Sequence, residues 1–386
     1  MKNRLFGTTL FLSGCCIGAG MLGMPLITYQ AGFYPSLVLF ILSFLFMTAT
    51  GFLLAETSFR FDEKTSLLMM SEQLLGKPAK WITCALFLFL MYALIAAYTI
   101  GAADIIQNTA QALGFELSSG TAMFLVTVVF AAALYLGTSF MDIFNRILMV
   151  GLGVGYLAII TIGSSSIDTG FLAEHDWSAS LYIAPIMIIA FGYHNLIPSM
   201  RSFLPSRRKL AEALLLGALI PLLIYLVWEF ILLGLLPLNQ KESINSMIKE
   251  GVMIGDVLKR LTQNGLIVLA VQIFTFCAIT TSYIGQSVSI IDLLGKHFKK
   301  NRLYLVCMTL LPPYLIAAYY PDIFLKALSS AGAYGAVIVF GIIPILMAYK
   351  ARRRDPSASP LLPGGNIILG LLLLFAVFVI ILEVIH

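Results

Sequence analysis

Long apolar segments alternate with short polar connections along the whole chain. The apolar runs are about 20 residues or longer, the length of a helix that crosses a bilayer, whereas barrel strands would be about 10 residues of alternating polarity. We therefore predict an all-α polytopic membrane protein. The eleven predicted transmembrane helices are 5–30, 33–58, 81–112, 121–138, 143–164, 181–203, 210–237, 263–294, 303–320, 322–349 and 364–385.

Two of these segments contain helix breakers. Residues 14–25 hold four glycines and end at Pro25, and the sixth segment contains Gly192 followed by Pro198. Lipid cannot hydrogen-bond an opened backbone, so a broken span must line a protein cavity or bind something. Two breaks in corresponding spans are a sequence pointer to the binding site of a secondary transporter.

Composition agrees with a membrane protein. The chain of 386 residues is 60% hydrophobic and 11% charged, whereas soluble domains carry about 25% charged residues. The first residues, Met-Lys-Asn-Arg before an apolar run, also fit a secretory signal. We reject that interpretation because no small-residue cleavage site follows and ten further spans come after the first.

The positive charges predict an orientation. With the N-terminus in the cytoplasm, 19 of the 24 Lys and Arg residues fall on the cytoplasmic side, as the positive-inside rule requires. We expect a multi-pass protein of the bacterial cytoplasmic (inner) membrane, with a cytoplasmic N-terminus and a periplasmic or extracellular C-terminus.

The span count divides the chain into two halves. Residues 1–164 hold five spans and residues 181–349 hold five more, and each group opens with a broken span. Since an odd number of spans inverts the second half, we predict a 5+5 inverted repeat with broken helices 1 and 6. The extra eleventh helix, 364–385, follows a Pro/Ser/Gly linker.

Broken helices offer backbone groups to a ligand. The N–H groups that open the second half of the first span carry partial positive charge and suit a carboxylate. The carbonyls that end the first half of the sixth span suit an ammonium, so one zwitterionic amino acid would bridge both breaks. The predicted substrate contacts at the breaks are Gly18, Ala19, Gly20, Met21, Ala190, Phe191 and Gly192.

Packing is the alternative interpretation for some of these glycines. Gly14 and Gly18 form a Gly-x-x-x-Gly pattern, which is typical of closely packed membrane helices. Both interpretations stay open at this point.

Two ionisable side chains are candidates for proton coupling. His194 lies inside the second break, and Glu229 lies in the middle of the seventh span. An ionisable group at membrane depth predicts a functional role, and histidine titrates near neutral pH. His194 is also a candidate substrate contact. Its alternative role is to satisfy backbone groups of the broken helix as a neutral side chain.

The motifs resemble those of a known family. Ile-Gly-Ala-Gly-Met-Leu-Gly-Met-Pro in the first span and Phe-Gly-Tyr-His-Asn-Leu-Ile-Pro-Ser in the sixth look like the bacterial tyrosine and tryptophan permeases. These are the hydroxy/aromatic amino acid permeases of the amino acid–polyamine–organocation superfamily. A third match is Thr-Ser-Tyr-Ile-Gly at residues 281–285. The resemblance covers nearly the whole chain.

The resemblance implies a proton-coupled importer of aromatic amino acids, closest to the tyrosine branch, with tryptophan as an alternative. It implies that the third span lines the pocket, so we favour Tyr98 over Tyr92 as a substrate contact, together with Thr281. In sodium-coupled relatives of this fold, a cation binds between the first break and the eighth span. The corresponding residues here are Gly14, Ile17, Thr280, Thr281 and Ser282.

Other functions fit less well. A sodium-coupled amino acid symporter of the same fold is the second hypothesis. An intramembrane enzyme is disfavoured because the sequence lacks paired metal-binding motifs and a Gly-x-Ser-x-Gly elbow, and a channel because no filter-like element appears. We expect no cofactor, no metal site and no nucleic-acid partner. We expect a monomer in the lipid bilayer that binds a small amino acid.

Overall fold

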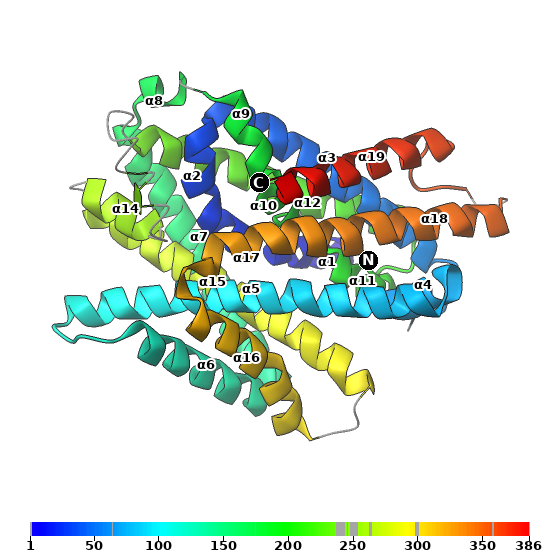
Figure 1. Cartoon of the computed structure of the whole chain (residues 1–386), viewed down its shortest axis with the longest axis horizontal. Coiled ribbons are helices and arrows are strands. Elements are labelled where there is room, and N and C mark those ends of the chain that lie inside the picture. The colour runs from blue at the N-terminus through cyan, green and yellow to red at the C-terminus, as the bar shows by residue number, and fades with distance from the viewer. Residues whose placement is uncertain are drawn as a thin grey trace.

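A computed structural model describes residues 2–63, 65–173, 175–236, 244, 246–247, 254–261, 265–297, 301–356 and 359–385. Within these ranges the chain is helical and forms no strand. The long helices run side by side along the longest dimension of the molecule, with α8 and α14 at one end and α4 at the other (Figure 1). The helices are α1 (Lys2–Cys16), α2 (Ala19–Ala31), α3 (Phe33–Ser58), α4 (Leu67–Leu75), α5 (Lys77–Ala112), α6 (Ser119–Leu136), α7 (Thr138–Gly163), α8 (Thr169–Ala173), α9 (Trp177–Ser180), α10 (Ala184–Ile189), α11 (Ile197–Phe203), α12 (Arg207–Leu235), α14 (Ile254–Leu261), α15 (Gly265–His297), α16 (Arg302–Tyr319), α17 (Phe324–Ser330), α18 (Ile343–Arg354) and α19 (Gly365–Ile385).

Ten helical stretches of the described chain are long and apolar enough to cross a bilayer. They correspond to the second to eleventh predicted spans. The first predicted span, 5–30, is present as the shorter helices α1 and α2, of 15 and 13 residues. The prediction of an all-α polytopic membrane protein is therefore confirmed for these ranges. The inverted repeat remains a prediction.

The first break lies at Ile17 and Gly18, between α1 and α2. Close packing around Gly18 requires a glycine at this break. A Cβ atom on Gly18 would collide with the side chain of Ser282, which approaches from α15. Pro25 does not break the chain, because it lies inside α2. The predicted interruption is thus present, and it lies at the N-terminal side of the glycine-rich segment.

The second break separates α10 from α11. Residues 190–193 form turns without regular helix, and a short 3₁₀ turn, His194–Leu196, leads into α11. Pro198 lies in the first turn of α11, where its missing N–H costs nothing. The sixth predicted span is therefore broken near its middle, as the sequence indicates.

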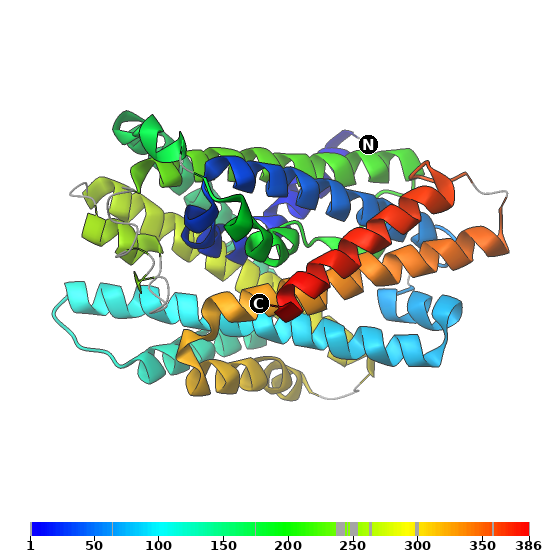
Figure 2. The ribbon, with the colours of Figure 1, turned by 45° about the horizontal axis from the view of Figure 1, so that its top comes forward.

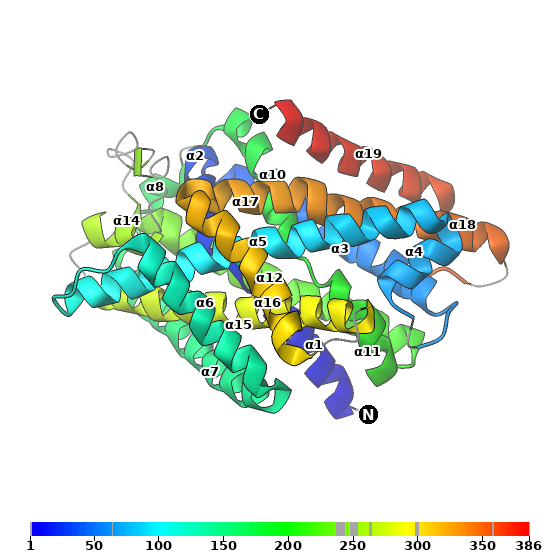
Figure 3. The ribbon, with the colours of Figure 1, turned by 60° about the horizontal axis from the view of Figure 1, so that its bottom comes forward.

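Among the described residues, the two most extensive helix–helix contacts are made by α15 and α12. Helix α12 packs against α1 and α3, and α15 packs against α5 and α7. Helix α19 crosses the outside of the bundle next to α18 (Figure 2). Helices α6 and α7 lie on the opposite side from α19 (Figure 3).

A long π-helical stretch, Ala331–Ile342, joins α17 to α18. π-Helices are rare and usually short, and they often mark functional sites. This one packs against α10 so closely that a Cβ on Gly332 would overlap the backbone of Pro185. At its start, the Ser329 hydroxyl donates to Glu383 of α19 at 2.6 Å. The stretch thus packs against the start of α10 through Gly332, and its Phe340 reaches the second break beside Gly192.

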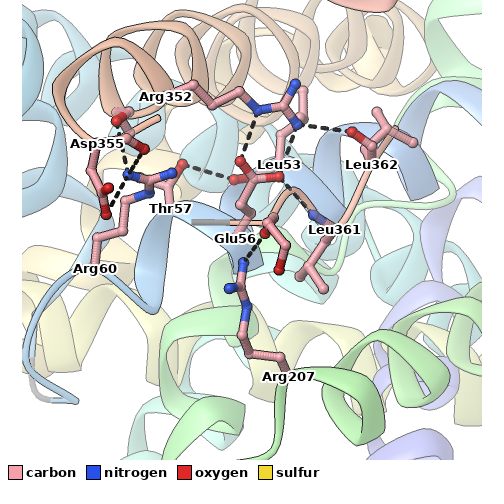
Figure 4. Close-up of polar contacts among 11 residues, drawn as sticks. Leu53, Glu56, Thr57, Arg60, Arg207, Arg352, Asp355, Leu361 and Leu362 are labelled. Atoms are coloured by element: carbon pink, nitrogen blue, oxygen red, sulfur yellow. Dashed lines mark hydrogen bonds and ion pairs between the residues drawn. The ribbon is translucent and has the colours of Figure 1, made fainter. Parts of the chain in front are cut away.

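A charged network joins α3, α18 and the linker to α19 (Figure 4). Glu56, which is 1% exposed, accepts two hydrogen bonds of 2.8 Å from Arg352. The backbone N–H of Leu361 donates to the same carboxylate at 2.9 Å. Arg60 donates to the carbonyl of Ala351 at 2.8 Å. We call this set of contacts the Glu56 network.

Two further arginines tie neighbouring helices to the same region. Arg201 of α11 donates to the carbonyls of Ser58 and Phe61, which follow from α3. Arg207 at the start of α12 donates to the carbonyl of Ser359 at 2.8 Å. Helices α3, α11, α12 and α18 are therefore linked at one end of the bundle.

Candidate functional site

A small cavity lies beside the two breaks. Its walls come from α1, α5, the end of α10, α15 and the π-helical stretch, so the first, third, sixth, eighth and tenth spans all reach it. Most of the lining side chains are apolar, but polar atoms make up about half of the wall surface. Among the described residues it is lined by Cys15, Cys16, Leu90, Met91, Leu94, Tyr98, Ile189, Gly192, Gln286 and Phe340.

The cavity is closed in this conformation. Its volume is about 20 Å³, which is space for no more than one water molecule. Tyr98 is 3% exposed, and Gly192 lies in the wall of the cavity. A molecule as large as an amino acid would therefore enter only when the surrounding helices separate.

The first turn of α2 closes the chain after the first break. The N–H of Met21 donates to the Gly18 carbonyl at 3.0 Å, which turns the chain into α2. The Met21 side chain is fully buried. Ala19 and Gly20 begin α2, and their surroundings lie outside the described side chains. The N–H groups of this first turn are those that a helix leaves without intrahelical acceptors.

The second break presents its backbone to the same region. Ala190 is 2% exposed, and Phe191 is fully buried against the rings of Phe44 and Tyr225. A Cβ on Gly192 would lie 2.9 Å from the carbonyl oxygen of Ile189. Only glycine leaves room for this turn of the backbone.

Helix α12 braces both breaks. The Tyr225 hydroxyl lies 2.5 Å from the carbonyl oxygen of Cys16 and 3.0 Å from that of Ala190. Trp228 Nε1 donates to the Met21 carbonyl at 3.0 Å. Both side chains are fully buried. Helix α12 therefore supplies hydrogen bonds to the Cys16 and Ala190 carbonyls at the breaks, and to the Met21 carbonyl, whose partner in α2 would be the N–H that Pro25 lacks.

Glu229 lies next to this brace. It is 1% exposed, and its Oε2 lies 2.5 Å from the Thr28 hydroxyl of α2. The same hydroxyl donates to the Met24 carbonyl at 2.7 Å. Glu229 Oε1 has no hydrogen-bond partner in the described part of the chain. The carboxyl group thus has one polar contact in an otherwise apolar place.

His194 is fully buried and lies outside the cavity lining. Its ring is stacked between Tyr193 and Phe340, at centroid distances of 5.2 and 5.0 Å. Nε2 lies 3.0 Å from Thr50 Oγ1, and that hydroxyl donates to the Phe46 carbonyl at 3.0 Å. While Thr50 donates to Phe46, Nε2 is the donor of its contact with Thr50. Nδ1 finds no partner among the described residues, which fits a neutral ring.

The predicted cation residues divide into two groups. A Cβ on Gly14 would lie 3.2 Å from the Met149 side chain of α7, which fits the packing interpretation of the Gly-x-x-x-Gly pattern. Thr281 donates to the Ala278 carbonyl and is not among the cavity-lining residues. The hydroxyls of Thr280 and Ser282 are buried and have no partner among the described residues, and Ile17, 4% exposed, lies at the break itself.

The structure separates the two tyrosines of the third span. Tyr98 lies in the cavity wall, as the sequence predicts. The Tyr92 hydroxyl instead donates to the Met308 carbonyl of α16 at 2.8 Å. Within the described residues, no group of three or more His, Cys, Asp or Glu side chains is placed to hold a metal ion.

Sequence reasoning missed Tyr225, Trp228 and Gln286. Tyr225 lies four residues before Glu229, so the two share one face of the helix. Trp228 comes directly before Glu229. That spacing was a usable signal. Gln286 lies one turn after Ser282 in the eighth span, but no motif marks it.

Comparison with known proteins gives one family. The model of the tryptophan/tyrosine permease family matches residues 1–383. Tyrosine-specific transport system 2 of Haemophilus influenzae is 31% identical, over 98% of this chain and 96% of the relative. The tryptophan-specific transport protein of the same organism is 27% identical, over 98% and 95%. Glutamine transporter 2 of Aliivibrio fischeri is 27% identical over the full length of both chains.

Proposed function

Because the chain belongs to the tryptophan/tyrosine permease family and is a multi-pass membrane transporter of amino acids rather than an enzyme, we propose that it imports aromatic amino acids, tyrosine foremost, by proton symport. The observation that carries the proposal is the closed cavity beside two broken helices, in which apolar side chains and polar atoms share the wall about equally. Tryptophan is the alternative aromatic substrate, since relatives include transporters named for either amino acid.

The breaks provide for the zwitterionic end of the substrate. The first turn of α2 presents N–H groups with partial positive charge, which suits the carboxylate. The end of α10 presents carbonyls at Ile189 and Ala190, next to the cavity, which suits the ammonium. Tyr225 already contacts the Ala190 carbonyl. A carbonyl oxygen has two lone pairs, so it can accept a second hydrogen bond from the substrate.

The cavity walls provide for an aromatic side chain. Leu90, Met91, Leu94 and Phe340 are each at most 5% exposed and line the space beyond the breaks. Ligand sites of this kind are mostly apolar, with a few polar groups that fix orientation. An aromatic ring gains the most from burial against such walls.

The geometry of Glu229 supports its role as the proton carrier. The Thr28 hydroxyl has one hydrogen, and a helical threonine commonly donates it to the carbonyl four residues earlier, here Met24. With that donation the Glu229 carboxyl carries the hydrogen of the 2.5 Å contact, and when the carboxyl is ionised the same hydroxyl donates to Oε2 instead. A neutral carboxylic acid also tolerates an unpartnered Oε1 in an apolar place. Loss of this proton places a charge between α2 and α12, which favours their separation.

Sodium coupling is the second candidate, on one specific observation. The Ser282 hydroxyl is buried beside Gly18 of the first break, and it and the buried Thr280 hydroxyl have no partner among the described residues. Two hydroxyl oxygens and nearby carbonyls would suit a monovalent cation. Proton coupling ranks first because the buried Glu229 carboxyl has a hydroxyl partner already in place, so it needs no ion other than the proton.

The remaining features of the transporter follow the sequence. We place it in the bacterial cytoplasmic membrane with the N-terminus inside and the C-terminus outside. In this orientation 19 of the 24 Lys and Arg residues fall on the inner side. We assign 1–164 and 181–349 to inverted repeats that move against each other in alternating access, as a monomer. The Glu56 network then lies at the cytoplasmic end.

Uptake by purified protein in liposomes tests the function. Radiolabelled tyrosine should accumulate against its gradient when the outside is acidic, without sodium. Competition by all twenty amino acids should single out tyrosine, tryptophan and phenylalanine. Accumulation that requires a sodium gradient at equal pH would favour the second candidate. Competition by glutamine but by no aromatic amino acid would overturn the aromatic assignment.

A further inference from the structure

The cavity contains one amide side chain. Gln286 of α15 lines the cavity and is 6% exposed. Its Oε1 has no hydrogen-bond partner in the part of the chain that the structure describes. A buried carbonyl-type oxygen without a donor destabilises the protein until a donor reaches it. Such an atom in the wall of a binding site indicates a donor on the ligand.

The position of Gln286 matches the far end of a substrate. Ser282 touches Gly18 at the first break, and Gln286 lies four residues later on the same face of α15, about 6 Å along the helix axis. Helices α5 and α15 run in opposite directions (Figure 1). Leu94, four residues before Tyr98, therefore lies on the same side of the break as Gln286.

The cavity thus has a polar end and an apolar end with one amide. A zwitterion held at Gly18 and Gly192 directs its side chain toward Leu90, Leu94 and Gln286. An aromatic ring fills the space between these apolar walls, and only a donor at the tip of the ring reaches Oε1. The phenol O–H of tyrosine is such a donor.

We propose that Gln286 is the specificity-determining residue of the site, and that its Oε1 accepts a hydrogen bond from the phenol of tyrosine. This inference rests on the proposed function, because it assumes that an aromatic amino acid occupies the cavity. It adds the reason why tyrosine is preferred over phenylalanine. Apolar pockets discriminate weakly against an added hydroxyl, whereas a site that bonds the hydroxyl discriminates strongly.

A substrate–residue cycle tests the contact. Gln286→Met keeps the length of the side chain and removes the acceptor. The ratio of tyrosine to phenylalanine affinity, measured by equilibrium binding to the purified protein, should fall about tenfold, the effect of one lost hydrogen bond. Phenylalanine affinity itself should stay unchanged or rise. Gln272→Met on the same helix, which lies outside the cavity, is the matched control and should leave the ratio unchanged.

Equal loss of affinity for tyrosine and phenylalanine in Gln286→Met would overturn the inference and leave the aromatic transporter intact. Failure of the wild-type protein to bind any aromatic amino acid would instead overturn the proposed function. Gln286→Glu keeps an acceptor oxygen at the same position and should retain the preference for tyrosine. Loss of the preference in Gln286→Glu would contradict the proposal even if Gln286→Met does not fold.

Discussion

Glu56 and Glu229 are both 1% exposed, yet their surroundings differ. Glu56 receives two hydrogen bonds from Arg352 and one from the Leu361 N–H. Glu229 has one contact, with Thr28, and an Oε1 without a partner among the described residues. The first carboxylate is fully paired at one end of the bundle, and the second is half-satisfied beside the brace of the two breaks.

The difference shows where the protein keeps charge. A buried carboxylate with a bidentate arginine is held in one position. A half-satisfied carboxyl is tolerated only while neutral, so gain or loss of its proton changes the packing around it. The Glu56 network is therefore suited to stability, and the Glu229 site to a change of partners. Four substitutions break or sharpen this comparison.

The largest expected effect is that of Arg352→Ala. It leaves Glu56 charged and unpaired in a buried place, which costs about 3–5 kcal/mol. Thermal or denaturant unfolding in detergent would measure the loss. Lys350→Ala, an exposed position of the same helix, is the control and should cost little. A double change of Glu56 and Arg352 to Met should recover much of the loss, and no recovery would argue against the pairing as its cause.

Tyr225→Phe comes next. It removes the hydroxyl that contacts the carbonyls of both breaks, so about 1–3 kcal/mol of stability and a large part of transport should be lost. Tyr156→Phe is the matched control, because its hydroxyl donates to the Ile224 carbonyl at 3.0 Å, away from the breaks. Stability and uptake rate would be compared for the two variants. Equal effects on uptake would show that the brace has no special role in transport.

Glu229→Gln should change coupling more than stability. The amide keeps the shape and can donate to Thr28, but it binds no proton. A gradient of one pH unit supports about tenfold accumulation for one proton per substrate, and this accumulation should disappear while exchange of labelled for unlabelled substrate continues. Persistent pH-driven accumulation in Glu229→Gln would rule out Glu229 as the carrier.

His194→Gln should have the smallest effect. The amide nitrogen of glutamine can replace Nε2 as donor to Thr50, and only the ring stacking with Phe340 is lost. Tyrosine affinity should weaken by a few-fold at most, since one such contact is worth about 1 kcal/mol, and pH-driven accumulation should remain. Loss of accumulation would make His194 the proton carrier in place of Glu229.

The sequence predicted the scaffold of the site well. Apolar length located the spans, and glycine density located both breaks, because these are local properties of the chain. Tyr98, predicted as a substrate contact on the resemblance to a family, lies in the cavity wall, and the substrate contact itself stays a prediction. Glu56 and Glu229 could not be distinguished as paired and unpaired, since Arg352 lies almost 300 residues from its partner in the sequence.

The remaining features depend on contacts between distant helices. The brace by Tyr225 requires α12 to lie beside α1 and α10, which no local pattern specifies. Gln286 is an ordinary polar residue until the cavity is seen around it. The π-helical winding of Ala331–Ile342 also has no sequence signal, because alanine, glycine and valine fit an α-helix as well.

The continuous run of α17, the π-helical stretch and α18 is bonded to other helices on both sides of its π-helical part. Ser329 is tied to α19 through Glu383 at its start, and Arg352 is tied to α3 at its end. Between them, the i→i+5 bonds of the π stretch wind the chain by a smaller angle per residue than an α-helix does. Because both ends are held by other helices, a change of this stretch from π-helical to α-helical winding would rotate the residues between them. Phe340 would then turn about the helix axis in the wall of the cavity.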